Sequence, residues 1–547
     1  MESIDLKDFK ILLVVVYEPL LMSNLHEELG ISYVGAYLRS KGFTVHFMTV
    51  NGDEDVLDAI TDVKPNLIGY TTYNASLNCI LALCEKVKTK LKSVYNCLGG
   101  VCATAYGSTI LENNAQIDFV VQGEGELTFY ELALKLSQGD SPQGIDGLIY
   151  REKNKIITNR PRPLIQDIDE LPLPSRDILE KNQLSVAQIC TSRGCISKCT
   201  FCTSQLIWKK WRGRDVVHVV DEIEMIVNKY GIQIFNFVDN SFEDSEDRSI
   251  DRLLRLANEI VNRNLQIGYF SSFRAEFHRK ATPELMEILV KSGLYMVCVG
   301  FEAANEPDLK LYGKIATVED NEKVIELFNK YHIAIDPGFI NFNPYSTLDR
   351  LESNLSFLQR HGFAIRIYDF INRFQMYPGT ALSKRLENSP LVYNSSLDEY
   401  SYYFQDPVIG QLYGHITEHC MSQKSRIKVE FEKIRFYAGN YSCYLRFTAN
   451  KCYKGNQQAY KILMDHVSYI ESTLFELSNA MCKWFAHLLG LSKSGWDDIS
   501  AVQISNEYLN ICYVQDILKQ LDKDKTNMFR KLMRIDLQCV NKISYIL

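Results

Sequence analysis

The segment C-T-S-R-G-C-I-S-K-C-T-F-C, residues 190–202, places four cysteines in a short stretch of a 547-residue chain. Cys195, Cys199 and Cys202 form the spacing C-x3-C-x2-C, and Cys190 stands outside it. These three cysteines follow a strand-like run at residues 184–192, so a loop after a strand is expected to carry them.

Three kinds of site are open for these cysteines. Cys195, Cys199 and Cys202 can hold a [4Fe–4S] cluster that leaves one iron without a protein ligand, as an activating or substrate-binding site requires. Cys190 as a fourth ligand would give an electron-transfer cluster instead. Zinc sites usually pair two C-x2-C units or add histidines, and no second unit is near. Cys190 is predicted to lie inside the strand and to pack in the core.

Composition and charge exclude several classes of protein. Apolar residues make up 46% of the chain and the formal net charge is −7, so a packed core is expected and broad nucleic-acid binding is not. The N-terminus is acidic and no apolar run approaches the roughly 20 residues that span a bilayer. We therefore expect a cytoplasmic protein whose 15 cysteines are reduced and available to metals.

Residues 1–140 alternate strand-like and helix-like segments. Buried runs such as residues 11–16 and 66–73 read as parallel strands, and residues 31–42 and 75–91 read as helices. This pattern predicts a doubly wound, Rossmann-like α/β domain, whose ligands lie beyond the carboxyl ends of the strands. The expected strand ends are residues 17–19, 71–74, 99–100 and 123–126.

Three further regions follow. Residues 141–183 are predicted to be a linker with a small hairpin, and residues 184–388 hold six strands separated by helices. Those strands are expected at residues 184–192, 234–241, 267–276, 296–304, 333–342 and 365–374. Six βα units suggest a partial or full (β/α) barrel of the TIM type with its site at the carboxyl ends of the strands. Residues 389–547 are predicted to be a mainly helical domain.

These motifs together resemble the cobalamin-binding subclass of the radical S-adenosylmethionine (SAM) superfamily. The cysteine motif has Phe201 before its last cysteine, with T-S-R-G-C in front and K-W-R-G-R-D-V-V-H after it. Further matches are V-D-N-S-F-E-D-S, F-R-A-E-F, V-G-F-E-A-A-N-E, M-Y-P-G-T-A-L, and in the first domain L-G-G-V-C-A-T and Q-G-E-G-E. The resemblance covers residues 8–385.

The resemblance implies three cofactors: a [4Fe–4S] cluster on Cys195, Cys199 and Cys202, SAM on its open iron, and cobalamin on the first domain. Reductive cleavage of SAM would give a 5′-deoxyadenosyl radical that abstracts hydrogen from an unactivated carbon. The protein would aim that radical and exclude water. Cys190 would then belong to the strand.

Four polar residues near predicted strand ends are candidates for the SAM site. Glu302 is expected to accept hydrogen bonds from the methionine amine or a ribose hydroxyl, and Arg274 to pair with the methionine carboxylate. Asp239 and Asn240 end the second barrel strand and are likewise expected to bind SAM. For each of the four, a structural ion pair or a strand cap is the alternative.

The cobalamin candidates are taken from the four strand ends of the first domain. Well-known cobalamin proteins carry Asp-x-His-x-x-Gly, but here Asn24 replaces the aspartate and His26 lies four residues before Gly30. We therefore predict cobalamin without a histidine ligand. The candidates are Tyr17, Thr71, Thr72, Tyr73, Asn74, Gly99, Gly100, Gly123, Glu124, Gly125 and Glu126. The glycines would let the backbone approach the cofactor, and Tyr73 and Asn74 would lie under cobalt.

Three functions remain open. The first is a cobalamin-dependent C-methyltransferase, in which methylcobalamin delivers a methyl group to a substrate radical and a second SAM restores it. The second is a radical enzyme that rearranges, contracts or cyclises its substrate without methyl transfer. The third is a non-enzymatic cobalamin or iron–sulfur sensor. We expect a monomer with a small-molecule or peptide substrate, a low-potential electron donor, and a C-terminal domain that recognises substrate or forms a lid.

Overall fold

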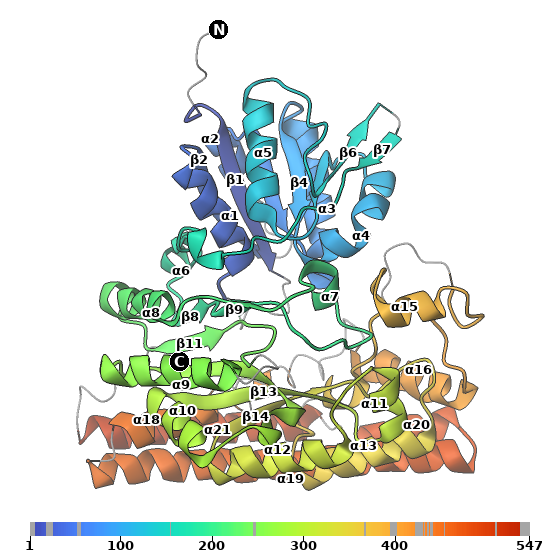
Figure 1. The fold of residues 1–547 in the computed structure, drawn as a ribbon. Coiled ribbons are helices and arrows are strands. Elements are labelled where there is room, and N and C mark those ends of the chain that lie inside the picture. Colours follow the sequence, from blue (N-terminus) through green and yellow to red (C-terminus); the bar gives the residue numbers. More distant parts are fainter. Residues whose placement is uncertain are drawn as a thin grey trace. The chain divides into compact units, whose positions relative to one another are not determined.

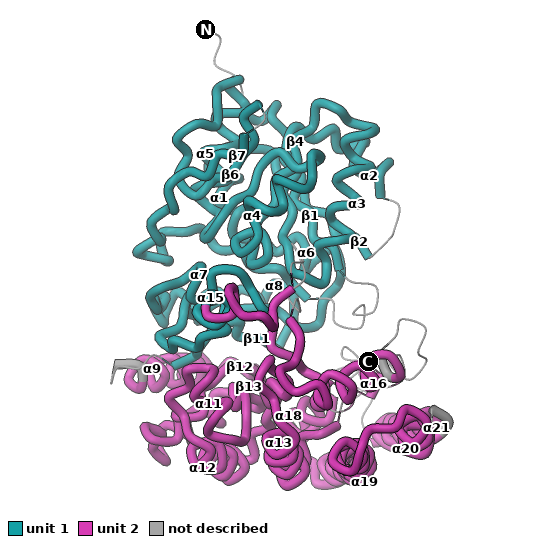
Figure 2. Tube along the Cα trace, turned by 90° about the vertical axis from the view of Figure 1, so that its right-hand side faces the viewer, with its two compact units in different colours: residues 1–244, 376–384, 395–399 teal, residues 245–375, 385–394, 400–547 magenta. Residues whose placement is uncertain are grey.

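The computed structural model divides into two compact units. Unit 1 comprises residues 1–244, 376–384 and 395–399, and unit 2 comprises residues 245–375, 385–394 and 400–547 (Figure 2). The structure describes residues 6–17, 26–51, 56–153, 155–243, 248–365, 368–393, 402–421, 430, 433–434, 437, 441–452, 455–508 and 511–535. Within these residues no helix combines the length and the apolar character needed to span a membrane.

Unit 1 begins with a seven-stranded sheet of order β2-β1-β3-β4-β5-β6-β7. The first five strands are parallel, and the last two form a hairpin that continues the sheet in antiparallel fashion. Their bounds are β1 Lys10–Tyr17, β2 Thr44–Asn51, β3 Leu67–Thr71, β4 Tyr95–Gly99, β5 Phe119–Val121, β6 Leu148–Glu152 and β7 Lys155–Thr158. The hairpin expected in the linker therefore exists, and it belongs to the first sheet.

Helices cover both faces of this sheet, which confirms the doubly wound fold (Figure 1). Side chains of β1 alternate between two cores because successive residues of a strand point to opposite faces. Leu13 and Val15 pack with α1 Leu29–Ser40 and α5 Gly125–Ser137. Leu12 and Val14 pack with the opposite layer, which consists of α2 Leu57–Val63, α3 Asn74–Lys90 and α4 Val101–Asn113.

The strand order fixes where a ligand is expected. Strands β1 and β3 are neighbours in the sheet, while the chain leaves β1 toward β2 on one side and leaves β3 toward β4 on the other. Such a reversal opens a crevice beyond the carboxyl ends of the strands, and doubly wound proteins bind their ligands there. The crevice of this sheet lies beyond Tyr17 and Thr71.

The remainder of unit 1 carries the cysteine motif. Its elements are η2 Ile168–Glu170, α6 Asp177–Lys181, β8 Val186–Ile189, β9 Ser192–Arg193, α7 Ser204–Ile207, β10 Arg212–Gly213, α8 Val216–Tyr230 and β11 Ile234–Phe237. Strands β8 and β11 are parallel, and β9 and β10 are antiparallel. The β9–β10 ribbon closes the base of residues 194–211, which we call the cysteine loop.

Cys190 lies just after β8, although the sequence predicts it inside the strand. The chain leaves the strand there because the next two backbone N–H groups, those of Thr191 and Ser192, donate to the carboxylate of Asp239 at 2.8 and 2.6 Å. A side-chain acceptor thus takes the place of a neighbouring strand.

Unit 2 contains three strands that pair in parallel, β12 Gly268–Arg274, β13 Leu294–Glu302 and β14 Ala334–Phe339. Its helices up to residue 371 are α9 Arg248–Asn262, η3 Ala275–Arg279, α10 Pro283–Ser292, α11 Glu306–Leu311, α12 Val318–Lys330, α13 Leu348–Arg360 and α14 Tyr368–Ile371. The alternation of strands and helices confirms the α/β class of this region.

The sixth predicted strand, at residues 365–374, is wrong in the part that the structure describes. Tyr368–Ile371 form α14, and the described pairing of this stretch is an isolated bridge between Arg373 and Phe342. The apolar run misled the prediction because Phe370 and Ile371 are buried on a helix, and a short apolar run does not distinguish a strand from a buried helical turn.

The C-terminal region is helical, as predicted. After α15 Ala381–Leu386 come α16 Pro407–Met421, α18 Ser442–Cys452, α19 Gln457–Ser494, α20 Asp498–Tyr508 and α21 Ile511–Met533. Helix α19 buries an apolar stripe at helical spacing that includes Leu463, Val467, Ile470 and Leu474, and α13, α16, α18, α20 and α21 pack around this helix. The bounds of the four regions drawn from the sequence stay a prediction.

Candidate cofactor site

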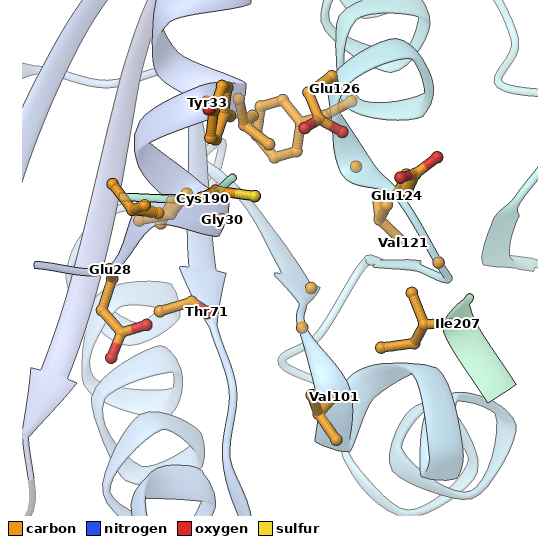
Figure 3. Close-up of a pocket in the computed structure, with 18 of the residues that line it drawn as sticks. Glu28, Gly30, Tyr33, Thr71, Val101, Val121, Glu124, Glu126, Cys190 and Ile207 are labelled. Atoms are coloured by element: carbon orange, nitrogen blue, oxygen red, sulfur yellow. The ribbon is translucent and has the colours of Figure 1, made fainter. Parts of the chain in front are cut away.

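A cavity of about 330 Å³ lies within unit 1 at the carboxyl edge of the seven-stranded sheet. One wall comes from the ends of β3, β4 and β5 and from the start of α1. The opposite wall comes from residues 188–240. It includes Gln188, Cys190, Ser192, Arg193, Ile207, Trp208, Val238 and Asn240. Figure 3 shows Cys190, Thr71, Glu124 and Ile207 around this space. Its volume is in the range of cofactor pockets.

Nine residues predicted from the sequence line this cavity. They are Thr71, Tyr73, Gly99, Gly100, Gly123, Glu124, Gly125, Glu126 and Asn240. Eight of them were assigned to cobalamin and Asn240 to SAM, so the structure brings together residues from both predicted sites.

Three other cobalamin candidates do not line the cavity. The Tyr17 hydroxyl donates to the carbonyl oxygen of His26 at 2.5 Å. The Thr72 hydroxyl donates to the Gly99 carbonyl at 2.7 Å and accepts from the Ala103 N–H at 3.0 Å, so it supports the turn after β4. Both polar atoms of the Asn74 amide are buried at the start of α3 and have no hydrogen-bond partner among the described residues.

Glycines leave space for a ligand along the first wall. A Cβ at Gly30 or Gly123 would meet nothing within 4 Å, and one at Gly99 would meet only the Tyr70 carbonyl oxygen, at 3.9 Å. Gly123 has φ of +75°, a conformation that favours glycine. These positions therefore leave part of this wall of the cavity free of side chains.

His26, Glu28 and Tyr73 form a hydrogen-bonded row at the cavity. The Glu28 carboxylate lies 2.9 Å from His26 Nε2 and accepts from the Tyr73 hydroxyl at 2.8 Å. Burial and the charge of Glu28 raise the pKa of Tyr73, so its phenol stays protonated and donates. Tyr73 and His26 could be singled out from the sequence, but Glu28, which connects them, could not.

Glu124 and Glu126 bind the arginines at the base of the cysteine loop. Glu124 Oε1 lies 3.1 Å from Arg193 Nη1 and 2.8 Å from Arg212 Nη2, and Glu126 Oε1 lies 2.7 Å from Arg193 Nη2. Burial opposes ionisation of Glu124, but hydrogen bonds from Arg212 and the charge of Arg193 outweigh it and lower its pKa. Glu124 is therefore a buried carboxylate held in its charged form.

A second buried network fixes the chain that enters the second wall. Arg176 Nη1 donates to Glu27 at 2.7 Å, and its other terminal nitrogen donates to Glu222. Glu27 also accepts from the backbone N–H of Gln188 at 2.8 Å, and Arg214 donates to Glu222 at 2.5 Å. Buried charges of this kind persist in proteins when they are paired, as these are.

Cys195, Cys199 and Cys202 lie on the cysteine loop and are partly exposed. The loop is held locally by a hydrogen bond from the Cys202 N–H to the Cys199 carbonyl at 3.2 Å. The Gln205 side chain also donates to the carbonyls of Cys195 and Ser197 at 3.0 and 2.7 Å. Among the described residues, no three His, Cys, Asp or Glu side chains converge on one metal ion. Three thiols on one short loop are the kind of donor set that a [4Fe–4S] cluster takes.

Cys190 differs from these three cysteines. It is buried, packs with Leu29 and Tyr33, and its sulfur donates to the Ser192 carbonyl oxygen at 3.3 Å. Burial raises the pKa of its thiol to about 11. The packing role predicted for Cys190 agrees with this environment, although the residue also lines the cavity.

Asp239 and Asn240 hold the start of the cysteine loop. Both carboxylate oxygens of Asp239 accept hydrogen bonds from residues 191–192, including the Thr191 hydroxyl at 2.7 Å. Asn240 accepts from the Gly194 N–H at 3.3 Å and donates to Ser204 at 2.7 Å. These contacts favour the strand-cap interpretation for Asp239, whereas Asn240 also borders the cavity.

Arg274 and Glu302 end strands β12 and β13 in unit 2, as predicted. Arg274 lies 3.4 Å from Glu276, and Glu302 lies 3.6 Å from Lys314. Burial raises the pKa of Glu302 against the lowering effect of Lys314. Glu302 has φ of +66°, which is rare for a non-glycine residue and is typical of positions under functional constraint.

Sequence reasoning missed most of the second wall. Arg193 lies in the quoted motif T-S-R-G-C, which was the available signal, whereas Ile207 and Trp208 lie between the quoted motifs. Nothing in their local pattern indicated that they face the strand ends of another domain, because that contact joins residues about 70–90 positions apart.

Comparison with known protein families identifies two domains. Residues 22–133 match the model of the B12 binding domain, and residues 189–352 match the model of the radical SAM superfamily. The first match covers the sheet edge that borders the cavity, and the second begins just before Cys190.

Curated relatives and solved structures agree with these models. The chain is 30% identical to an uncharacterized methyltransferase of Pyrococcus horikoshii over 364 residues, covering 65% of this chain and 77% of the relative. It is 28% identical to the anaerobic magnesium-protoporphyrin IX monomethyl ester cyclase of Rubrivivax gelatinosus, covering 59% of this chain and 60% of the cyclase. The fold resembles that of the cobalamin-dependent SAM radical enzyme OxsB, with a TM-score of 0.66, 18% identity, and coverage of 98% of this chain and 83% of OxsB.

The chain therefore belongs to the cobalamin-binding radical SAM enzymes. The family, the enzyme class and the cofactor set predicted from the sequence, namely cobalamin, SAM and a [4Fe–4S] cluster, are confirmed.

Proposed function

We propose that this chain is a C-methyltransferase that binds cobalamin in the cavity of unit 1 and carries its cluster on Cys195, Cys199 and Cys202. One observation carries the proposal: the cavity at the carboxyl edge of the sheet is walled on its other side by residues that include Arg193, just before the three cysteines in the chain, and Ile207, a few residues after them. A cobalamin in this cavity would contact the segment that holds the cluster.

The residues that line the cavity have different roles toward the cofactor in this proposal. Gly30, Gly99 and Gly123 would give the corrin ring room, and Thr71 and Tyr73 would supply polar atoms to it. His26 is held by Glu28 and is not a cobalt ligand in this proposal. Apolar side chains such as Ile207 and Val121 keep water away from reactive species.

When bound, cobalamin supplies a methyl group, and the cluster with SAM supplies the radical that removes a hydrogen atom from the substrate. For SAM, we propose that Arg274 pairs with the methionine carboxylate and that Glu302 accepts from its amine or a ribose hydroxyl. Asn240 and, less directly, Asp239 would hold the cysteine loop beside it. The raised pKa of Glu302 would fall when a cationic amine pairs with it.

The proposed chemistry requires a substrate and an electron donor. We propose a small-molecule or peptide substrate recognised by the C-terminal helices, a low-potential electron donor, and action as a monomer without nucleic acid. A cluster on partly exposed cysteines suits the reducing cytosol.

Gly30 offers a direct test of the cavity. It lies in α1, and a side chain there would extend into open space without backbone strain, so Gly30→Phe should fill the cavity while Gly30→Ala should not. Each protein is mixed with hydroxocobalamin, desalted, and measured by absorbance. We expect the wild type and Gly30→Ala to retain cobalamin and Gly30→Phe to lose at least nine tenths of it. Equal retention by all three would place the cofactor elsewhere.

Cyclisation or rearrangement without methyl transfer is the second candidate. It is favoured by the similarity to the anaerobic cyclase of Rubrivivax gelatinosus. The two candidates differ in their SAM products, because methyl transfer leaves S-adenosylhomocysteine and reductive cleavage alone leaves 5′-deoxyadenosine and methionine.

A further inference from the structure

Glu124 belongs both to the cavity and to the base of the cysteine loop. Glu124 lines the cavity at the carboxyl end of β5, just before α5 (Figure 3). Its carboxylate accepts hydrogen bonds from Arg193, Trp208 and Arg212, which bracket the three cluster cysteines in the sequence. It also accepts from the backbone N–H of Ile165 at 2.8 Å.

The charges at the base of the cysteine loop explain why an anion is needed there. Arg193 and Arg212 are directly opposite each other in the antiparallel β9–β10 ribbon. Like charges in such a pair destabilise the ribbon, and both side chains are buried, with 8% and 5% of their surface exposed. Glu124 lies against both guanidinium groups and Glu126 against Arg193 alone, so Glu124 is the carboxylate that holds the two strands together.

We propose that Glu124 couples the cobalamin cavity to the cysteine loop, so that cobalamin binding stabilises the cluster and the cluster in turn favours cobalamin binding. The inference rests on the proposed cobalamin site. A ligand in the cavity would pack against Glu124 and against Ser192, Arg193, Ile207 and Trp208, and would oppose opening of the loop. Coupling of this kind is reciprocal and commonly amounts to a 5- to 150-fold change in affinity.

Iron loss from the cluster provides the measurement. A chelator takes iron when the cysteine loop opens, so the rate of loss follows the open population. Wild-type protein with a reconstituted cluster is exposed to a ferrous chelator anaerobically, with and without saturating hydroxocobalamin. We expect hydroxocobalamin to slow iron release at least fivefold.

Variants test the role of Glu124. Glu124→Gln keeps the volume but removes the charge, so iron release should become faster and lose most of its dependence on hydroxocobalamin. Glu124→Asp retains the charge and should restore part of that dependence. Glu131→Gln is the matched control: it lies on α5, the helix that follows Glu124, pairs with Arg162 away from the loop, and should behave as the wild type.

The outcomes separate the two proposals. If wild-type protein binds no cobalamin, the proposed cofactor site and this inference both fail. If it binds cobalamin and iron release is unchanged, only the coupling fails. If Glu124→Gln retains the full wild-type dependence, Glu124 is not the link. Should Glu124→Gln fail to fold, the wild-type pair of measurements still decides whether the coupling exists.

Discussion

The sulfur atoms of the cysteine segment differ in their surroundings. Cys190 is buried with a raised pKa, whereas Cys195, Cys199 and Cys202 are partly exposed. A buried neutral thiol is a poor metal ligand, since metals bind the thiolate. We expect the triple variant of Cys195, Cys199 and Cys202 to Ala to hold no iron and Cys190→Ala to keep about four irons per chain. Iron and sulfide analysis checks this, and an empty Cys190→Ala protein would contradict the three-ligand set.

The imidazole of His26 is bound to Glu28, and its spacing from Gly30 departs from the pattern of histidine-ligated cobalamin proteins. We therefore expect the cob(II)alamin form to show no nitrogen splitting in its electron paramagnetic resonance spectrum. The spectrum of His26→Ala should be the same as that of the wild type. A splitting that disappears in His26→Ala would make His26 the ligand.

At the residue scale, the sequence predicted the glycines and polar residues that follow parallel strands, because the edge of a doubly wound sheet is where such residues serve a ligand. The sequence did not predict which side chains these residues pair with. Glu124 was assigned to the corrin edge, but its carboxylate is bound by Arg193 and Arg212, whose side chains reach it from a distant part of the chain. Residues 18–25, which include Asn24, lie outside the described structure.

At the scale of elements, buried strands and capped helices were the most predictable features. Helix α8 has Asp215 at its N-cap and Gly231 at φ of +71° after its last turn, which are ordinary start and stop signals. The error at residues 365–374 came from a buried helical turn of four residues. Periodicity cannot identify an element that short, and only its packing distinguishes it from a strand.

Helix α12 depends on the charge of Asp320 at its N-terminus. This carboxylate accepts from the Thr317 N–H and lies 2.7–2.8 Å from His278 and Arg279. Burial disfavours its charged form, but these hydrogen bonds outweigh burial and lower the pKa of Asp320. Asp320→Asn should lower the free energy of unfolding by about 2–3 kcal/mol at pH 7.

The free energy of unfolding that Asp320 contributes should decrease as the pH falls. A carboxyl group with a lowered pKa in the folded state stabilises the protein above its unfolded pKa of about 3.9, and this stability disappears as the pH falls. The difference between wild type and Asp320→Asn should therefore shrink as the pH falls toward 3, as denaturant unfolding can show. Glu319→Gln is the control: its pair with Lys323 is exposed, so this variant should unfold like the wild type. A difference that grows on acidification would contradict the assignment.

At the scale of the whole molecule, the sequence assigned cobalamin to residues 1–140 and the cluster to residues 184–388. The structure adds that residues 188–240 share the cavity with the first domain, within unit 1. The β6–β7 hairpin, predicted as part of a linker, continues the first sheet. Pattern analysis recognised each region by itself. It could not predict the shared wall, because that wall consists of contacts between side chains and not of any local periodicity.

The central claim is that one chain uses SAM in two ways, as a methyl donor and as a radical source. The most direct measurement incubates cobalamin-loaded, cluster-reconstituted protein with SAM and a low-potential reductant, and quantifies S-adenosylhomocysteine and 5′-deoxyadenosine. We predict that both products form. Without cobalamin S-adenosylhomocysteine should disappear, and in the triple variant of Cys195, Cys199 and Cys202 to Ala 5′-deoxyadenosine should disappear. Formation of 5′-deoxyadenosine without S-adenosylhomocysteine in the fully loaded protein would contradict the methyltransferase and favour cyclisation or rearrangement.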